Sequence, residues 1–523
     1  MNFRHIAARA LGVITFPGAM LTAVVPALAQ DGVSIDDRIN QIITPFTQPI
    51  ADGVFWGPTV NGAILPLLVV WLMAGAVFFT VYMRFINIRG FRQSLKIVSG
   101  RYDNPNDPGE VTHFQALTAA LSGTVGLGNI AGVAIAISIG GPGATFWMIL
   151  AGLFGMTTKF VECTLGLKYR EIDENGVVSG GPMYYLSRGL AAHGFPRLGR
   201  VLAIMAAILC IGGSLGSGSL FQTNQATQQV MNVVASLSGG EVFAGSQWFF
   251  GLLIAIAAAA VVVGGIHSIA RVTARLVPFM GLLYVSSALV IIATHASGIP
   301  DAVGAIISGA ISPEGITGGF VGVLVQGFRR AAFSNEAGIG SAAIAHAAAK
   351  TTEPVAEGLV ALLEPFIDTV VVCTMTALVI ILTGQHLNPG SAGGITLTSN
   401  AFATVFTWFP YLLSVAAVLF AFSTSITWYY YGQRSAVYLF GNSAMVERIY
   451  KSAFLLTIVA GSGMQLTAVM DFADAMVLGM AFPNMVGLYI MAPEVKRMLK
   501  SYMERVASGE IRPYIGPTGQ PAQ

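Results

Sequence analysis

Long apolar stretches follow one another along almost the whole chain, separated by short polar segments. A helix needs roughly 20 apolar residues to cross the ~30 Å hydrocarbon layer of a bilayer, and each stretch is close to that length. The pattern predicts eleven membrane-spanning helices, at Gly62–Ile86, Phe114–Ile139, Ala144–Leu167, Val201–Leu220, Gln247–Gly264, Val277–Thr294, Gly318–Ala347, Leu359–Thr383, Tyr411–Tyr431, Ser452–Thr467 and Val469–Ile490. We therefore predict an all-α polytopic membrane protein.

Composition supports the membrane assignment. Hydrophobic residues make up 54% of the 523 residues and charged residues 10%, whereas a soluble protein carries roughly 25% charged residues. The 27 basic and 25 acidic residues give a net charge of +2 with no basic tract, which excludes a nucleic-acid partner. This composition predicts that the protein lies in the lipid bilayer. Nothing in the sequence indicates a protein partner.

The first 29 residues have the features of a secretory signal peptide. Arg4 and Arg9 precede an apolar run at Ala10–Val25, and an Ala-x-Ala site ends at Ala29. We predict a signal peptide at residues 1–29 and an extracytoplasmic segment at 30–61. An uncleaved helix is the alternative.

Lysine and arginine lie almost entirely on one side of the predicted topology. With the mature N-terminus outside, the inner loops hold clusters such as Arg84, Arg89 and Arg92, while the outer segments hold Arg38 alone. Positively charged loops stay in the cytoplasm. The pattern thus predicts a multi-pass protein of the bacterial plasma (inner) membrane, with an extracytoplasmic N-terminus and a cytoplasmic tail at 496–523.

Two octamers rich in glycine and polar residues interrupt the second and seventh spans. Residues 122–129 read Ser-Gly-Thr-Val-Gly-Leu-Gly-Asn, and residues 334–341 read Ser-Asn-Glu-Ala-Gly-Ile-Gly-Ser. Both are poor helix formers, and broken helices of this kind meet at the midplane of inverted-repeat transporters. We predict an extra first span and its loop at 62–110, followed by two five-helix repeats of opposite orientation at 111–300 and 301–495. Chance recurrence of Gly-x-Gly is the alternative.

The first octamer carries the candidate chemistry. Unwound backbone at Gly126 and Gly128 is predicted to leave N–H groups free, and such groups beside a half-helix N-terminus suit a carboxylate. Carbonyl groups of the same stretch, with Thr124 and Asn129, supply hard oxygen ligands that suit a small cation. A helix–helix hydrogen bond is the alternative role for Asn129.

Several blocks of sequence resemble the alanine/glycine:cation symporter family. They are Gly123–Ala134, Gly140–Ala144, Lys159–Thr164, Phe333–Gly338, Leu363–Thr369, Phe422–Ser425 and Trp428–Gly432. The resemblance implies sodium-coupled uptake of alanine or glycine, on a fold like that of the bacterial leucine transporter with its 5+5 inverted repeat. Leu127 and Ala331 stand where the family usually has Thr and Gly, and both lie beside the expected pocket.

The resemblance also implies which residues bind the amino acid and the ions. The first octamer is similar to the first broken helix of neurotransmitter:sodium symporters, which would place Thr124 and Asn129 at the sodium ion next to the amino acid. The expected amino-acid site comprises Thr124, Gly126, Gly128, Asn129, Gln326, Gly327 and Phe328. A second sodium site is expected from carbonyl groups of Ser122, Val125 and Phe420 and the hydroxyl groups of Ser423 and Thr424.

Charged residues inside the spans need partners. Glu364 and Asp368 are four residues apart, on one face of the eighth span, and the resemblance places that span beside the sodium ion. We expect Asp368 to supply the negative charge that compensates the ion. A structural pair of Asp368 with Arg329 or Arg330 is the alternative, and one of these two arginines is also a candidate partner for Glu336 or a gate residue.

Two further groups of residues are expected to have structural rather than transport roles. Lys159 and Glu162 are expected to form an intrahelical pair near an inner helix end, with the lysine reaching toward the interface. The aromatic run Trp428–Tyr431 is expected to belong to an interfacial belt.

We therefore predict a secondary active symporter that imports a small neutral amino acid, alanine or glycine, with sodium as co-substrate and without an organic cofactor. A passive channel or facilitator for small solutes and a proton-coupled amino-acid transporter are the alternatives. The two broken helices favour a transporter over a channel. The sequence contains no Walker motif and no nucleophile–base arrangement, so an ATP-driven pump and an intramembrane enzyme are not supported.

Overall fold

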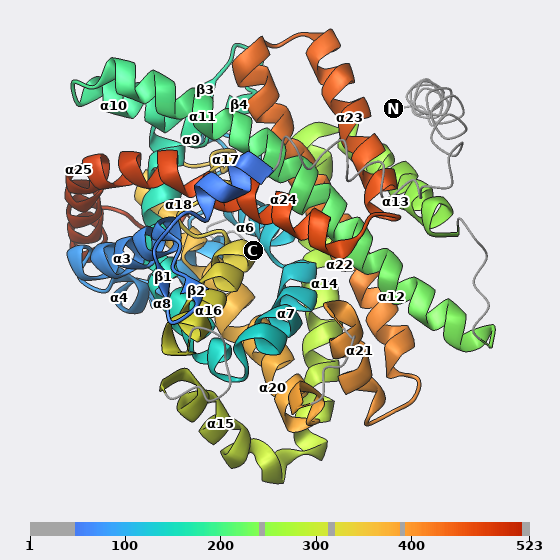
Figure 1. Ribbon diagram of the computed structural model, residues 1–523. Helices are drawn as coiled ribbons and strands as arrows, with labels where there is room; N and C mark the ends of the chain where they lie inside the picture. Colours follow the sequence, from blue (N-terminus) through green and yellow to red (C-terminus); the bar gives the residue numbers. More distant parts are fainter. Residues whose placement is uncertain (1–47, 240–245, 312–318, 388–392, 515–523) are drawn as a thin grey trace.

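The computed structural model describes residues 48–239, 246–311, 319–387 and 393–514, which form a helical bundle with two small antiparallel hairpins (Figure 1). After a helix at 48–54 come β1 Thr59–Val60, β2 Ala63–Ile64, α3 Leu67–Tyr82, α4 Ile86–Arg89, α5 Phe91–Lys96, η1 Ile97–Arg101, α6 His113–Thr124, η2 Leu127–Asn129, α7 Ala131–Gly140, α8 Gly143–Lys168, β3 Glu171–Ile172, β4 Val178–Ser179, α9 Pro182–Tyr184, η3 Tyr185–Gly189, α10 Leu190–Ala192, α11 Pro196–Leu215, η4 Gly216–Phe221 and α12 Gln222–Leu237, where η denotes a 3-10 or π-helical segment.

The remaining helices complete the bundle. They are α13 Ser246–Val262, α14 Gly265–Thr294, η5 Ala296–Gly298, α15 Ile299–Ile311, α16 Gly319–Asn335, α17 Ala342–His346, α18 Pro354–Ala361, α19 Leu363–Pro365, η6 Phe366–Cys373, α20 Thr374–Leu382, η7 Gln385–Leu387, α21 Ile395–Ala403, α22 Phe409–Phe440, α23 Ala444–Gly461, α24 Leu466–Gly479 and α25 Ala481–Ser508.

The number of spans differs from the expected eleven. Among the described residues, six helices are each long and apolar enough to cross a membrane, and the bent pair of α6 with η2–α7 makes a seventh. Three of the other expected spans correspond to α3, α13 and α16, which have 16, 17 and 17 residues and fall short of the roughly 20 that a span needs. The eleven-span count is therefore not confirmed, and the fold shown is a mostly helical protein with six or seven apolar spans.

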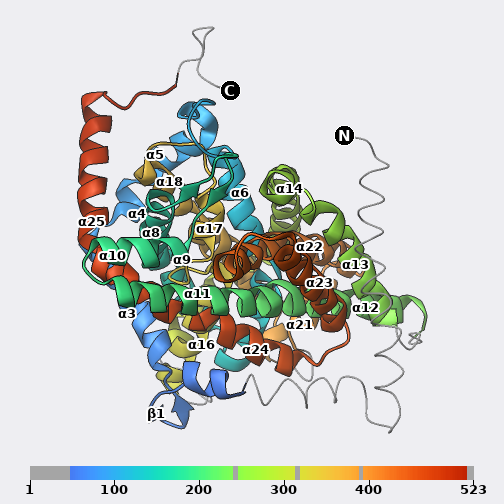
Figure 2. The same ribbon diagram turned by 90° about the horizontal axis from the view of Figure 1, so that it is seen from above.

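The expected cytoplasmic tail begins inside a helix. α25 continues through residue 496 to Ser508, and the Arg505 guanidinium donates hydrogen bonds of 2.7 and 2.6 Å to the carboxylate of Glu353. Figure 2 shows this helix along one edge of the bundle. The expected signal peptide, and the part of the segment 30–61 that precedes residue 48, lie outside the described residues.

Both glycine-rich octamers coincide with breaks between helices. α6 starts at a capping box formed by Thr112 and Gln115 and ends at Thr124, after which Gly126 is extended and the chain bends by 56° into α7. α16 ends at Asn335, and Glu336, Gly338 and Gly340 have φ values of 57°, 87° and 90° before α17 begins. The two predicted breaks are confirmed, while the inverted symmetry that would relate them stays a prediction.

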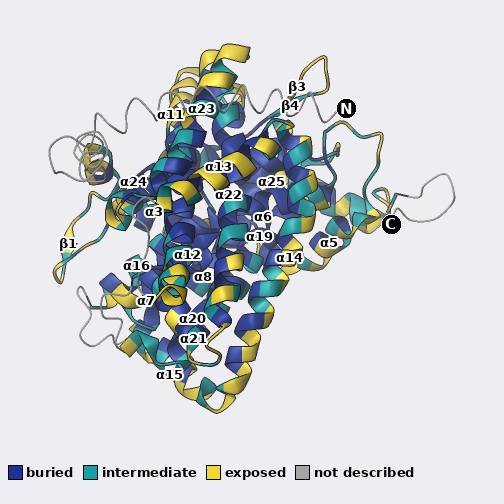
Figure 3. Ribbon diagram, turned by 90° about the vertical axis from the view of Figure 1, so that its right-hand side faces the viewer, coloured by how far each residue is buried: buried dark blue, intermediate teal, exposed yellow. Residues whose placement is uncertain are grey.

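α8 lies in the middle of the bundle and packs against α3, α15, α16, α17 and α18. Small residues allow these backbones to approach closely, as is usual between helices in membranes. A Cβ atom added to Gly327 on α16 would lie 2.7 Å from the Ala144 carbonyl oxygen on α8, and one added to Gly166 on α8 would lie 2.9 Å from Ala343 Cβ on α17. Figure 3 shows buried residues gathered around α6, α8 and α22, with exposed residues at the periphery.

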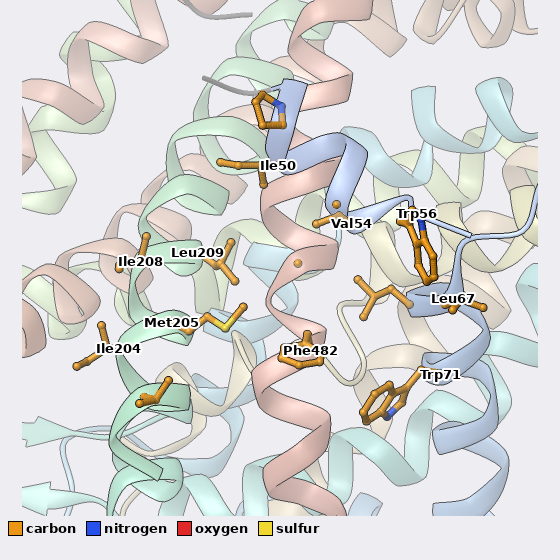
Figure 4. A pocket seen from close by; sticks show the side chains of 15 residues that line it. Ile50, Val54, Trp56, Leu67, Trp71, Ile204, Met205, Ile208, Leu209 and Phe482 are labelled. Carbon is orange, nitrogen blue, oxygen red and sulfur yellow. The ribbon is translucent and has the colours of Figure 1, made fainter. Parts of the chain in front are cut away.

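An apolar groove of about 780 Å³ lies between the helix at 48–54, α3, α11 and the start of α25 (Figure 4). Trp56 and Trp71 line one side, Met205 and Leu209 the other, and Phe482 its floor. No charged side chain is among its lining residues. A zwitterionic ligand would lose its hydration there without compensation, so this groove is not the candidate site.

Candidate functional site

The backbone between α6 and α7 is held by two side-chain amides. The Gly126 N–H donates to Asn129 Oδ1 at 2.8 Å, and the Leu127 N–H donates to Gln222 Oε1 at 3.0 Å. The expectation of a free N–H group at Gly126 is therefore wrong. In lipid every freed backbone group needs an internal partner, and these amides provide one. A carboxylate would reach the Leu127 N–H only by displacing Gln222.

Asn129 also connects the break to the eighth expected span. Its Nδ2 donates to Asp368 Oδ1 at 2.6 Å and to the Asp368 carbonyl oxygen at 3.0 Å. The other carboxylate oxygen, Oδ2, accepts from Ser334 Oγ at 2.9 Å and from Thr369 Oγ1 at 2.7 Å. The cluster thus joins the end of the first broken helix, the end of α16 and the π-helical segment η6, and all four residues are fully or almost fully buried.

Asp368 has no ion-pair partner among the described residues. The alternative of a pair with Arg329 or Arg330 is wrong, because both guanidinium groups contact Asp474 of α24. Arg329 Nη2 lies 2.7 Å from Asp474 Oδ2, and Arg330 Nη2 contacts the same oxygen. A buried carboxylate without a countercharge is costly, so the Asp368 cluster suits a small cation.

The π-helical segment η6, Phe366–Cys373, separates two carboxylates that were expected on one face. Asp368 points to Asn129, whereas Glu364 in α19 contacts His346 and lies 3.4 Å from Lys159 Nζ. An i→i+5 segment changes the angular offset between neighbouring turns and is frequent at functional sites. Spacing alone could not reveal this change.

A second cluster joins α6 to α22. Ser122 Oγ lies 2.6 Å from Ser423 Oγ and donates to the Ser423 carbonyl oxygen at 2.7 Å. Thr424 Oγ1 is buried and has no hydrogen-bond partner among the described residues. A Cβ atom added to Gly126 would lie 2.5 Å from this hydroxyl, so Thr424 faces the break directly. Hydroxyl and carbonyl oxygen atoms from α6 and α22 thus come together at the break, and such neutral oxygen atoms suit a small cation.

The other residues expected at the ions are close in sequence to these clusters. Val125 is the C-terminal cap of α6, and Phe420 lies one turn before Thr424 on α22, where its ring packs edge-on against Tyr284. The Thr124 hydroxyl donates back to the carbonyl groups of Ala120 and Leu121, both at 3.4 Å. In this arrangement Thr124 is engaged within its own helix.

Three residues expected around the amino acid do not gather at the break. Gly327 packs against α8, Phe328 lies beside Trp147 with ring centroids 6.3 Å apart, and Gln326 lines a separate hollow together with Arg329. The physical reason is that α16 stays helical to Asn335, so these three residues lie about two turns or more before the break. Phe333 and Ser334 occupy the position instead, and the nearest heavy atoms to a Cβ added at Gly128 are theirs, at 3.6 Å.

Sequence analysis did not identify the residues that the junction of η4 and α12 brings to the break. Gln222 follows the π-helical segment η4, and Phe221 before it packs edge-on against Phe333 with ring centroids 5.2 Å apart. The available signal was a run of side-chain amides, Gln222, Asn224 and Gln225, just after a stretch of small residues inside an apolar region.

The aromatic run and the charged residues also differ from expectation. Trp428–Tyr431 is buried rather than interfacial, and Trp428 Nε1 donates to Glu336 Oε1 at 3.1 Å. Glu336, whose other oxygen accepts from Ser341, therefore does not pair with Arg330. Lys159 is fully buried within α8, so it does not reach the interface, although its expected contact with Glu162 is confirmed at 3.7 Å.

Comparison with known proteins gives consistent matches along the chain. The sodium:alanine symporter family matches residues 54–515. The sodium/alanine symporter AgcS of Methanococcus maripaludis is 38% identical over 450 residues, which cover 85% of this chain and 96% of AgcS. The amino-acid carrier protein AlsT of Bacillus subtilis is 32% identical over 84% of this chain and 90% of AlsT. The crystal structure of MhsT in complex with L-phenylalanine overlaps with a TM-score of 0.46 at 15% identity, covering 73% of this chain and 98% of MhsT.

Proposed function

The chain belongs to the sodium:alanine symporter family, and on that premise we propose that it is a secondary active symporter that imports alanine or glycine with sodium. Family membership supports a sodium-coupled amino-acid transporter with several membrane spans. The structural observation that carries the finer proposal is the break between α6 and α7. There Asn129 binds Asp368, a buried carboxylate with no ion-pair partner among the described residues, and Gly126 faces the Thr424 hydroxyl.

Sodium binds first beside Asp368 in this proposal. The ion supplies the positive charge that the buried carboxylate lacks, and the Asn129 side chain and nearby carbonyl groups supply neutral oxygen ligands. Asn129 then exchanges its hydrogen bond to Gly126 for the ion, which frees the Gly126 N–H group. Ion binding thereby creates a donor that the amino-acid carboxylate needs, and coupling follows from that exchange.

The second ion binds between α6 and α22. Thr424 Oγ1 and Ser423 Oγ face it from α22, and carbonyl groups of Ser122, Val125 and Phe420 complete the set in this proposal. Because the ligands come from two helices, the bound ion resists any movement that separates α6 from α22.

Small side chains are selected by the rings of Phe221 and Phe333, which contact each other next to the break. A methyl group or a hydrogen atom fits beside them at lower steric cost than a branched chain. We further propose the bacterial inner membrane as the location, with the N-terminus outside and the C-terminus in the cytoplasm, since the Lys/Arg bias supports that orientation.

Two other functions make different predictions. A passive channel or facilitator would carry the solute without an ion gradient, and a proton-coupled transporter would need no set of oxygen ligands for a metal cation. The hydroxyl groups of Ser122, Ser423 and Thr424, which gather at the break, favour sodium over both.

The proposal is tested by uptake of labelled alanine into proteoliposomes. A tenfold sodium gradient with an inside-negative potential of about 100 mV supplies about 3.7 kcal/mol for each ion, so even one coupled ion is enough for roughly 500-fold accumulation. We expect concentrative uptake that an inside-negative potential stimulates and that collapse of the sodium gradient abolishes. Equal uptake after collapse would instead identify a facilitator, and uptake that follows only a proton gradient would identify proton coupling.

Gly126 and Gly132 are expected to differ when changed to alanine. The new Cβ atom at position 126 would lie 2.5 Å from Thr424 Oγ1 and 3.0 Å from Gln222 Oε1, whereas at position 132 on α7 no atom lies within 4 Å. Gly126→Ala should therefore reduce alanine uptake at least about tenfold, while Gly132→Ala, the matched control, should stay near the wild-type rate. Similar losses in both variants, at equal membrane levels, would contradict the assignment of the break.

Thr424→Ala tests the second ion. Removal of one oxygen ligand should raise the sodium concentration for half-maximal uptake several-fold, with a smaller change in alanine affinity at saturating sodium. Ser414→Ala serves as the control, because the Ser414 hydroxyl on the same helix only donates to the Pro410 carbonyl oxygen. An unchanged sodium dependence in Thr424→Ala would remove this residue from the ion site.

Asp368→Asn tests the first ion. The amide keeps the size of the side chain but removes its charge, so sodium-driven uptake should fall by a factor of ten or more while the protein still reaches the membrane. Asp301→Asn, at the exposed start of α15, should leave uptake unchanged. Normal sodium-driven uptake by Asp368→Asn would mean that the carboxylate does not compensate the ion.

A further inference from the structure

Buried imidazole and carboxylate groups alternate in a continuous chain at one end of the bundle. His113 Nδ1 contacts Glu357 Oε2, Glu357 Oε1 lies 2.5 Å from His346 Nδ1, and His346 Nε2 contacts Glu364 Oε1. The side chains of all four residues are at most 1% exposed. Each link joins a group that can hold a proton to one that can accept it, so a proton can move along the chain by exchange between neighbours.

This series of imidazole and carboxylate groups starts near the protein surface. His113 Nε2 lies 3.9 Å from Asp103 Oδ1, and the Asp103 side chain, in the loop between η1 and α6, is 22% exposed. This loop follows the basic segment that contains Arg92 and Arg101, which the Lys/Arg bias assigns to the cytoplasm. The accessible end of the chain is therefore the cytoplasmic one.

The inner end of the series, Glu364, is connected through Lys159 and Glu162 to the break between α16 and α17. Lys159 Nζ lies 3.4 Å from Glu364 Oε2 and 3.7 Å from Glu162 Oε1. The other oxygen of Glu162 accepts from the Gly338 N–H at 3.2 Å and from Asn484 Nδ2 at 3.1 Å. Charge added to or removed from Glu364 thus acts, through Lys159, on the carboxylate that holds the Gly338 backbone.

The number of charges makes this cluster sensitive to protons. Glu162, Glu357 and Glu364 balance Lys159 and the two histidines only when both imidazoles are protonated. Glu336, in the break itself, adds a fourth carboxylate that has no ion-pair partner among the described residues and has a strained φ of 57°. Since buried net charge is costly, gain or loss of one proton changes the energy of this break.

We propose that His113, Glu357, His346 and Glu364 form a proton relay open to the cytoplasm, and that the protons it holds control movement of the break between α16 and α17 during transport. A proton from cytoplasmic water enters at Asp103 and His113, passes through Glu357 and His346 to Glu364, and leaves by the same route. No other reactant is needed. The relay shares no residue with the proposed sodium sites, and the ligand that it binds is the proton.

Other titratable groups face the relay from the elements packed around it. They are Cys163 on α8, Arg170 just after the end of α8, and Tyr431 on α22, while Tyr185 on η3 faces Glu162 and Cys163. Cys163, His346 and Glu364 are close enough together to suggest a metal ion. The Lys159 ammonium next to Glu364 opposes a divalent cation at that point, and both nitrogens of His346 already contact carboxylates, so the proton is the better-fitting ligand.

The relay is tested with right-side-out membrane vesicles in which the inside and outside pH are set independently. We expect the maximal rate of sodium-driven alanine uptake to change at least about threefold as the inside pH is varied between about pH 6 and 10, because the neighbouring carboxylates favour the protonated form of both imidazoles. Variation of the outside pH alone should have little effect. A rate that ignores the inside pH, or that follows the outside pH equally, overturns the proposal.

Variants connect this pH dependence to the chain. His346→Gln should flatten the inside-pH profile, while His193→Gln, a partly exposed histidine next to Glu494, should keep the wild-type profile. Asp103→Asn, at the exposed entrance, covers the case in which His346→Gln fails to insert. Loss of its negative charge weakens proton binding at His113, so its profile should shift to lower pH. Wild-type profiles in His346→Gln or in Asp103→Asn contradict the relay.

A second measurement does not depend on the transported substrate. Amide hydrogen exchange of residues 336–341 in the purified protein, corrected for intrinsic rates, should change with pH in the wild type and not in His346→Gln. If alanine is not transported, the proposed function fails while this readout still decides about the relay, which rests on the proposed function only for its transport assay. An exchange pattern independent of pH in the wild type overturns it.

Discussion

A helix that breaks inside a membrane must satisfy its freed backbone groups without water. In this protein the Asn129 side chain provides a central part of that hydrogen bonding. Asn129 accepts from the Gly126 N–H with its carbonyl oxygen and donates to Asp368 with its amide nitrogen. The same residue therefore holds the first break open and ties it to η6. Any ligand that attracts the Asn129 carbonyl oxygen changes the backbone, and any change in the Asp368 charge changes the position of Asn129.

Within the described part of the chain, the buried cations pair with carboxylates other than that of Asp368. Two arginines of α16 contact Asp474, and Lys159 lies between Glu162 and Glu364. The protein thus contains enough cations to neutralise Asp368 but places them elsewhere. In a low-dielectric interior this arrangement is costly unless an external cation completes it. The separation therefore argues for an ion site more strongly than the presence of a carboxylate alone.

Sequence analysis could predict the helical membrane fold, the family and the two breaks, because hydropathy and the glycine-rich octamers are local signals. Asn129, Asp368, Ser122 and Ser423 were also within reach, since polar residues in apolar runs are conspicuous. Gln222, Phe333 and Ser334 were missed because their positions depend on where α16 and the π-helical segment η4 end. The pairing of Arg330 with Asp474 joins residues 144 positions apart, so no local pattern indicated the pair.

The two breaks are held by different chemistry, and this difference assigns them different controls. Neutral amides of Asn129 and Gln222 hold the first break; they do not titrate, so its backbone responds to ligands that compete for amide oxygen atoms. Carboxylates of Glu162 and Glu336 hold the second break; they respond to charge and to protons. Ser334 joins the two systems, because it lies in the last turn of α16 before the second break and donates to Asp368 beside the first. A cation at Asp368 weakens the pull of that carboxylate on Ser334, so occupation of the first break reaches the second through this one hydroxyl group.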